Sequence, residues 1–301
     1  MYTVQFSPFH FVEHADAREF DRRVGKWLFL REAENSYILG NLRDILAGRC
    51  DAGGAHPRLF SLEDDGAVAA AAVLFSDGML VFTWATLPML RVLAQGLAVA
   101  RCQIKTIFAP AHLSGPFASI WAELTGQRWA MGPEERVYQL ARLRCDPPPT
   151  GRLELAAPAH QLLVLPWMEN FIRETDYVDR RAAPLVETLI RQQQLYLWLD
   201  PQPVSMAAWV MPTLHAACIN FVYTPPELRG RGHGKAVVSA LARHMLDSGL
   251  QFCFIYTGTS DLLSNSLYQK VGARTLCEFM RCAILPPLRQ GAPAGAALIG
   301  S

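Results

Sequence analysis

A loop rich in glycine and basic residues is the part of this sequence best suited to binding a ligand. It joins the apolar stretch 217–223 to the amphipathic stretch 235–248 and reads Arg229-Gly230-Arg231-Gly232-His233-Gly234-Lys235-Ala236. Glycines allow main-chain N–H groups to approach a ligand closely, and the start of a helix adds the positive end of a dipole. Basic side chains add charge at the same place. The combination predicts a site for a phosphate or diphosphate group.

Spacing excludes two common phosphate-binding loops. A dinucleotide fingerprint would need a glycine three residues after Gly232, where Lys235 stands. A Walker loop would need a glycine at the position of Arg229 and a serine or threonine at Ala236. The segment therefore belongs to another class of phosphate site.

The loop resembles the Arg/Gln-x-x-Gly-x-Gly/Ala signature of the GNAT N-acetyltransferase superfamily, with Arg229, Gly232 and Gly234 at the specified positions. The flanking VYTPPELRGRG and the later SNSLYQKVGA are also similar to a bacterial group of predicted acetyltransferases with two tandem GNAT-like halves. The resemblance covers about residues 195–284. In the first half, only scattered features such as LREAENSYILGNL (30–42) are similar to that group.

The resemblance implies a site for acetyl-CoA as co-substrate. The loop amides would grip its pyrophosphate, while the preceding strand, 220–223, would splay from its neighbour and pair with the pantetheine arm. A backbone N–H near the splay would then polarise the acetyl carbonyl. The expected cofactor-binding residues are Phe221, Val222, Tyr223, Arg229, Gly230, Arg231, Gly232, His233, Gly234, Lys235, Ala236 and Asn265.

The segment 261–270 resembles a second family signature, Asn-x-x-Ser/Ala-x-x-x-Tyr. Ser264 and Tyr268 fit it, and Asp261 replaces the asparagine. The resemblance implies that Tyr268 protonates the departing CoA thiolate as a general acid. The alternative is a core tyrosine whose hydroxyl has a backbone partner. Asn265 is a candidate contact to the pantetheine amides, in a part of the site that Asp261 alters.

A general base is also needed, because an amine acceptor is mostly protonated at neutral pH. Glu169, Glu174 and Asp176 lie in the segment 167–177, which in this fold would be the helical region near the acceptor. Glu174 is the first candidate, and a solvated helix face is the alternative for all three. We expect His215 to be a turn residue and His233 a loop residue.

Strands and helices alternate in the same order in both halves of the sequence. The second half has expected strands at 195–199, 204–210, 217–223, 252–256 and 275–284, with helices at 235–248 and 261–270. The first half has expected strands at 79–86, 104–109 and 136–144, with helices at 88–101 and 114–125. The repeated order predicts a duplicated α/β fold.

The resemblance implies that this is an α/β (α+β) fold of two tandem GNAT-like domains. Each would be a mixed, largely antiparallel sheet flanked by helices. The N-terminal domain is expected to be degenerate, because Leu87-Pro88-Met89-Leu90 stands where the other copy has its glycines. No phosphate cradle can form there by the same mechanism.

Breaker residues predict the domain limits. Three prolines within 146–151 interrupt the pattern and indicate a boundary. We expect a degenerate GNAT-like domain at 1–146, a catalytic acetyl-CoA-binding domain at 151–285 and a flexible tail at 286–301. A length of 301 residues also suggests two domains of about 150 residues each.

Composition excludes several classes of partner. Lys and Arg number 28 against 27 Asp and Glu, so no strong field would hold nucleic acid or an anionic membrane. The N-terminus lacks the layout of a secretory signal, and no apolar run is long enough to span a bilayer. We therefore expect a cytoplasmic protein without nucleic-acid or membrane partners.

The seven cysteines are Cys50, Cys102, Cys145, Cys218, Cys253, Cys277 and Cys282, an odd set without a C-x-x-C pair. Neither a disulfide framework nor a zinc site is indicated, and no metal is expected. Cys218 and Cys253 are interpreted as packing residues, with a covalent acyl-cysteine route as a minor alternative.

The hypothesis from the sequence is a direct transfer of acetyl from acetyl-CoA to a primary amine of a small molecule or peptide, by a monomer or homodimer. Two alternatives stay open. One is a non-catalytic acyl-CoA sensor or interaction module, favoured by Asp261 and by the lack of an obvious base. The other is a transferase that uses a longer acyl-CoA or an aminoacyl carrier as donor.

Overall fold

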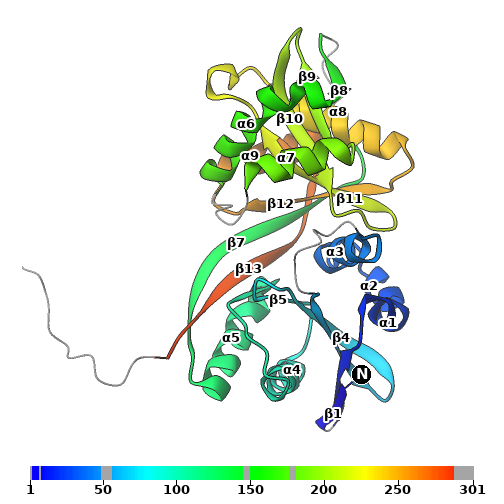
Figure 1. The fold of residues 1–301 in the computed structure, drawn as a ribbon, viewed down its shortest axis with the longest axis vertical. Helices are drawn as coiled ribbons and strands as arrows, with labels where there is room; N and C mark the ends of the chain where they lie inside the picture. Colours follow the sequence, from blue (N-terminus) through cyan, green and yellow to red (C-terminus); the bar gives the residue numbers. More distant parts are fainter. Residues whose placement is uncertain (1, 7, 49–55, 145–149, 176–180, 288–301) are drawn as a thin grey trace, which may run out of the picture. The chain divides into compact units, whose positions relative to one another are not determined.

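A computed structural model describes residues 2–6, 8–48, 56–144, 150–175 and 181–287 of the chain (Figure 1). The chain forms two compact units that interleave along the sequence. Unit 1 comprises residues 1–13, 56–132 and 280–301, and unit 2 comprises residues 14–55 and 133–279. Each unit is described by itself.

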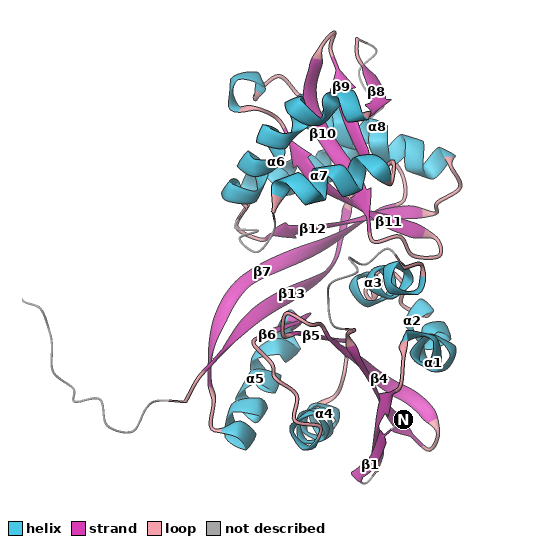
Figure 2. Cartoon of the chain, in the orientation of Figure 1, coloured by secondary structure: helices cyan, strands magenta, loops and turns pink. Residues whose placement is uncertain are grey.

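Unit 1 is a mixed sheet with two helices packed against it (Figure 2). Its strands are β1 (Tyr2–Phe6), β2 (Phe9–His14), β3 (Arg58–Asp64), β4 (Ala67–Leu74), β5 (Met79–Phe82) and β6 (Thr106–Pro110). They are neighbours in this order, followed by the end of β13 (Arg274–Leu285). Strands β3, β4 and β5 pair antiparallel, and β5 pairs parallel with β6. The helices are α4 (Leu87–Val99) and α5 (Ala111–Thr125).

Unit 2 also has mixed strand pairing, with helices on both faces of its strands. Its strand order is β7 (Arg128–Leu140), β12 (Phe252–Gly258), β11 (Ala216–Tyr223), β10 (Pro203–Val210), β9 (Leu195–Leu199) and β8 (Arg152–Leu155). Only the pair β11–β12 is parallel among the pairs of this order. The helices are α1 (Ala17–Phe20), a π-helical turn (Asp21–Gly25), α2 (Lys26–Phe29), α3 (Ser36–Leu46), α6 (Gln161–Glu174), α7 (Ala182–Arg191), α8 (His233–Asp247) and α9 (Leu262–Val271).

The predicted duplication is confirmed by the pairing of the strands. In unit 1, β4 is antiparallel to β5 and β5 is parallel to β6, and in unit 2 the same relation holds for β10, β11 and β12. A helix joins each parallel pair, α4 in unit 1 and α8 in unit 2. The fold is therefore α/β with a mixed, largely antiparallel sheet repeated along the chain, as the sequence predicts.

The two halves of the sequence exchange their last strands. Strand β7 ends the first half, yet it pairs antiparallel with β12 of the second half, from Cys253↔Leu140 to Gly258↔Glu135. The end of β13 lies in unit 1, where the N–H of Ile284 donates to the carbonyl oxygen of Lys105 at 2.8 Å. The compact units consequently do not coincide with the predicted domains 1–146 and 151–285. That division stays a prediction, and residues 145–149 and 288–301 lie outside the described residues.

Most predicted elements of the second half are found within a few residues of their expected limits, but two strands of the first half differ. Strand β5 ends at Phe82, four residues before the expected limit, and β7 covers 128–140 in place of 136–144. Residues 128–135 of β7 are mostly exposed, and they include Gly132 and Pro133. The alternation of apolar residues that predicts a strand is therefore missing from this part of the sequence. A Cβ at Gly132 would lie 3.1 Å from the carbonyl oxygen of Arg281, so the glycine permits a close approach to β13.

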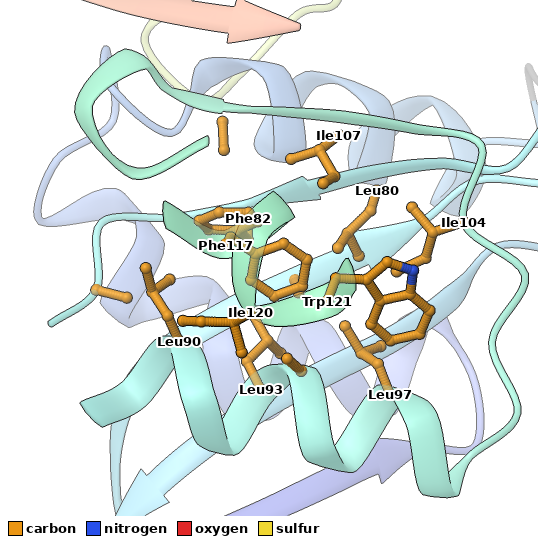
Figure 3. Packing of buried hydrophobic residues seen from close by; sticks show 14 of the residues in the cluster. Leu80, Phe82, Leu90, Leu93, Leu97, Ile104, Ile107, Phe117, Ile120 and Trp121 are labelled. Atoms are coloured by element: carbon orange, nitrogen blue, oxygen red, sulfur yellow. The ribbon is translucent and has the colours of Figure 1, made fainter. Parts of the chain in front are cut away.

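The core of unit 1 fills the space between its sheet and α4 and α5 (Figure 3). The rings of Phe82 and Phe117 lie 4.9 Å apart, and the indole of Trp121 donates to Gln127 at 2.8 Å. Around them pack Leu80, Leu90, Leu93, Leu97, Ile104, Ile107 and Ile120. The first half therefore retains a fully packed hydrophobic core although it lacks the glycine loop.

Unit 2 has three clusters of buried side chains around its sheet. One lies under α8 and contains Val237, Leu241 and Met245, which recur at four-residue spacing within the expected helix 235–248. A second lies between α6, α7 and the strands β9 to β11. In the third, Ala33 of the first half packs with Cys218 and Phe254. Nearby, the hydroxyls of Ser36 and Tyr256 are 3.0 Å apart. Residues 33–36 of the first half thus pack against the sheet of the second half.

One helical glycine in unit 1 tests this packing. A Cβ at Gly96 of α4 would lie 2.3 Å from the buried ring of Phe11. We expect Gly96→Ala to lower the free energy of unfolding by about 1–3 kcal/mol, because overpacking outweighs the better helix propensity of alanine. Urea denaturation measures the change.

Gly115→Ala is the matched control, because Gly115 is also a helical glycine, within α5. Its Cβ would lie 3.6 Å from Trp129, which is an ordinary van der Waals distance. Its stability should be unchanged or higher. A Gly96→Ala protein as stable as the parent would contradict the packing of α4 on β2.

Candidate active site

The loop between β11 and α8 offers a run of main-chain N–H groups that are not used inside the protein. The N–H groups of Leu228 and Arg229 donate to Pro225 and Pro226 at 2.9 and 3.2 Å, and that of Ala236 donates to Gly232 at 2.9 Å. Between them, the N–H groups of residues 230–235 have no acceptor among the described residues. These are the donors that a bound anion would need.

The glycines of the loop serve two different purposes. Gly230 and Gly232 have φ angles of 79° and 86°, which L side chains rarely adopt, and a Cβ at either would meet nothing within 4 Å. They are needed for conformation, and the space beside them holds no protein atom. A Cβ at Gly234 would lie 3.3 Å from Leu267 and 3.5 Å from Thr224, so Gly234 allows α9 to approach the first turn of α8.

The basic residues of the loop point to different partners. The Nε of Arg229 donates to the carbonyl oxygen of Thr224 at 2.8 Å, and its Nη2 donates to Glu174 at 2.8 and 3.0 Å. Its guanidinium also lies over the ring of Tyr223, 5.3 Å from the centroid. Arg231 and Lys235 form no ion pair among the described residues, apart from a 3.4 Å hydrogen bond from Arg231 to a carbonyl. These two cations remain available to an anion at the loop.

Strand β11 contains a bulge just before the loop. Met206 of β10 faces Tyr223, whereas Ala208 faces Asn220, so β11 has one extra residue between these pairs. At the bulge Phe221 has a φ of 53°, and its N–H donates to the side chain of Asn220 at 2.7 Å. The extra residue reverses the alternation of side chains. Ile219 packs in the α8 cluster, while Phe221 and Tyr223 pack in the α6–α7 cluster.

Strands β11 and β12 diverge beyond the bulge, as the family resemblance implied. Their parallel pairing runs from Ala216↔Phe252 to Cys218↔Phe254 and stops there. Strand β12 continues along β7 to Gly258, and β11 continues along β10 to Tyr223. In the described register, the edge of residues 219–223 that faces β12 is therefore left without a neighbouring strand. A ligand with amide groups could pair with it.

Helix α9 begins with a capping residue that replaces the family asparagine. The carboxylate of Asp261 accepts from the N–H of Ser264 at 3.0 Å. The amide of Asn265 donates to the carbonyl oxygens of Gly258 and Asp261, at 2.9 and 2.6 Å, and its Oδ1 accepts from Tyr138 at 2.8 Å. Asn265 is buried, so its side chain holds the β12–α9 turn together. A contact between Asn265 and pantetheine stays a prediction.

Tyr268 lies on the buried face of α9. Its side chain is 7% exposed, and its ring centroid is 6.0 Å from that of Tyr138 on β7. Leu267 beside it is the residue that approaches Gly234. Tyr268 is thus one residue from the contact between α9 and the loop, while its ring belongs to the hydrophobic core. Its role as a general acid stays a prediction.

The candidate bases are not gathered at one point. Glu174 is the last residue of α6 and forms an ion pair with Arg229, with side chains 40% and 45% exposed. The structure thus joins two residues that the sequence assigned to different roles. Glu169 is exposed on the same helix, and Asp176 lies outside the described residues. The role of Glu174 as a base also stays a prediction.

A second carboxylate, that of Glu32, pairs with His215 and so links the first half of the chain to the turn before β11. The Nδ1 of His215 lies 2.7 Å from Glu32, whose other oxygen accepts from the His215 N–H at 2.8 Å. Burial opposes ionisation of Glu32, but hydrogen bonds from Thr213 and His215 outweigh it and hold the pKa of its carboxyl below the usual value. His215 is a turn residue as expected. Its partner is 183 residues away in sequence, so no local pattern could reveal it.

Cys218 and Cys253 of unit 2 are buried in the sheet. Burial raises the pKa of the Cys253 thiol to about 12 and also raises that of Cys218, so the nucleophilic thiolate is scarce at neutral pH. Cys50 and Cys145 lie outside the described residues. Over the described ranges, no cluster of His, Cys, Asp and Glu is arranged to hold a metal, and no helix has the length and hydropathy to cross a membrane.

Solved structures share this arrangement over nearly the whole chain. A GCN5-related N-acetyltransferase from Sphaerobacter thermophilus is 14% identical with a TM-score of 0.59, over 92% of this chain and 96% of that one. A Drosophila protein is 10% identical with a TM-score of 0.62, over 92% and 99%. A tandem GNAT protein from the clavulanic acid biosynthesis pathway is 15% identical with a TM-score of 0.53, over 92% and 98%. At such low identity these matches show a shared fold.

The sequence itself matches one family model. Residues 197–282 match the model of the FR47-like protein family, and this range contains β11, the glycine loop, α8 and α9. No curated protein matches the chain in sequence. The matched range is also the one that carries the GNAT signature at Arg229, Gly232 and Gly234. The chain therefore has the fold of the tandem GNAT proteins, and residues 197–282 of its second half match the FR47-like family.

Proposed function

We propose that the protein is an N-acetyltransferase that moves an acetyl group from acetyl-CoA directly to a primary amine. The observation that carries the proposal is the run of unused N–H groups at residues 230–235, at the start of α8. Converging amides at a helix N-terminus suit a diphosphate, and Arg231 and Lys235 add positive charge. The diphosphate of acetyl-CoA meets this requirement.

The diverging strands support the same donor. Pantetheine carries amide groups along an extended chain, and the unpaired edge of 219–223 can accept such a chain as an added strand. In this proposal the thioester would lie near the bulge at Phe221. The N–H of Phe221 already donates to Asn220, so another N–H of the strand edge would stabilise the developing negative charge on the carbonyl oxygen. The bulge and the splay thus support a reaction site at this end of β11.

In the proposed reaction the amine nitrogen attacks the thioester carbonyl carbon. The new C–N bond forms as the C–S bond breaks, and the sulfur leaves with the bonding electrons. The amine loses its proton to a base, and we propose that the phenol of Tyr268 supplies a proton to the sulfur. The support for Tyr268 is its place on α9 beside Leu267, which contacts the glycine loop.

Two observations favour a second candidate, a non-catalytic module that binds acyl-CoA. Tyr268 is almost fully buried, and Glu174 is occupied by Arg229. Such a module would bind acetyl-CoA without releasing free thiol across a broad panel of amines. A transferase with another acyl donor would release thiol only with that donor, so a small panel of acyl-CoA thioesters distinguishes these alternatives.

The cradle itself is tested by binding. We expect isothermal calorimetry to detect acetyl-CoA binding to the parent protein and none to Gly232→Glu, since the added carboxylate would stand in the open space beside the loop and repel the diphosphate. Gly234→Glu should also lose binding, because its side chain would meet Leu267 and Thr224 and displace α9 from the loop. Gly126→Glu is a matched control for Gly232→Glu, because Gly126 has a φ of 71° and open space around it but lies at the end of α5. It should bind normally. If the parent protein gives no binding heat and no shift in melting temperature at millimolar acetyl-CoA, the proposal is wrong.

The role of Tyr268 is tested by turnover. An acceptor is first identified by mass spectrometry of a metabolite extract incubated with labelled acetyl-CoA. We expect Tyr268→Phe to lower kcat by on the order of a hundredfold while the Kd for acetyl-CoA is unchanged. Tyr138→Phe, on the neighbouring buried ring, removes a hydrogen bond to Asn265 and should lower stability more than turnover. Unchanged kcat in Tyr268→Phe would remove this residue from the mechanism.

A further inference from the structure

We propose that Glu174 is a positioning residue for the diphosphate-binding loop and is not the base that takes the amine proton. It holds Arg229, and Arg229 in turn holds the start of the loop. This inference rests on the proposed function, because it assigns a role within the same acetyl-CoA site.

The argument starts from the contacts of Arg229. Its guanidinium reaches three parts of unit 2: the carboxylate of Glu174 at the end of α6, the carbonyl oxygen of Thr224 after β11, and the ring of Tyr223. To reach a diphosphate, this side chain would have to give up these contacts together. The signature arginine of the loop therefore fastens the loop to α6 and β11, and the charge for the ligand comes from Arg231 and Lys235.

The same contacts make Glu174 unsuited to proton abstraction. Both of its oxygens accept from one guanidinium nitrogen, at 2.8 and 3.0 Å. Charge-assisted hydrogen bonds of this kind hold the carboxylate in place, with both oxygens directed at Arg229. A base must gain a proton during the reaction, and here that gain would release Arg229 from α6.

The loop has few other means of keeping its shape. The N–H groups of residues 230–235 have no acceptor within the described residues, and Gly230 and Gly232 are in left-handed conformations with open space around them. Arg229 fixes the loop on one side, and the first turn of α8 fixes it on the other. Without the Glu174 contact the loop would sample more conformations in the free protein. Ordering the loop would then cost entropy on binding, which weakens the binding free energy. The effect should therefore appear in Kd and not in kcat.

The first measurement compares Glu174→Gln with the parent protein. We expect the Kd for acetyl-CoA to rise by about threefold to tenfold, as for the loss of a well-oriented, partly exposed ion pair. At saturating acetyl-CoA, kcat and the shape of its pH profile should be unchanged. Glu227→Gln is the matched control, since it removes the same charge from the loop at an exposed side chain outside the Arg229 contacts. Its Kd should be unchanged or lower.

A double-mutant cycle tests whether Glu174 acts through Arg229. Arg229→Gln removes the guanidinium and keeps a residue that the family signature allows. We expect Arg229→Gln to raise the Kd, and we expect the added Glu174→Gln change to raise it no further. Additive effects of the two changes would show that Glu174 acts independently of Arg229, which would overturn the inference.

Hydrogen exchange without any ligand separates this inference from the proposed function. Peptides that cover residues 224–236 should exchange faster in Glu174→Gln than in the parent and in Glu227→Gln. A parent protein that fails to bind acetyl-CoA would refute the proposed function, while the exchange result would still decide whether Glu174 holds the loop. Unchanged exchange would overturn the inference. So would a fall in kcat of about a hundredfold with loss of the acid limb of the pH profile at constant Kd, the behaviour of a general base.

Discussion

The proposed chemistry depends on a short run of backbone whose N–H groups have no hydrogen-bond acceptor among the described residues. Residues 230–235 keep their N–H groups free of internal acceptors within the described chain, and the loop is largely exposed to water. Water can satisfy these donors in the free protein, so leaving them open costs little. The cost is conformational, because Gly230 and Gly232 must adopt left-handed angles. Glycine is the residue that meets this requirement without strain.

The comparison of the two halves shows how such a site is lost while the fold is kept. The first half retains the strand pairing and a packed core, but Pro88 has no N–H, and the N–H of Thr86 donates to the sulfur of Met89 at 3.2 Å. The start of α4 is thus closed by its own residues. Helix α5 of the first half and helix α9 of the second half each end at a glycine. Four residues before that glycine, α5 has Ala122, whereas α9 has Tyr268. Both features proposed for catalysis are confined to the second half.

The sequence predicted what short-range patterns encode. The face of α8 with Val237, Leu241 and Met245, the strands around it and the glycine loop all follow from spacing within a few residues. Long-range pairing was not predictable in this way. The exchange of β7 and β13, the packing of residues 14–48 in unit 2 and the pair of Glu32 with His215 join distant segments. The pair of Glu174 with Arg229 spans 55 residues and was read as two separate roles for the same reason.

The bulge in β11 explains why these features meet at one end of one strand. Side chains alternate along a strand, so one inserted residue turns everything after it to the other face. Without the bulge, Tyr223 would face α8 along with Ile219, and its ring could not lie beneath Arg229 on the α6 side. Arg229 would then lack its contact with the ring of Tyr223. A one-residue insertion therefore brings the ring of Tyr223 to the face where it lies against Arg229, the residue that holds the loop.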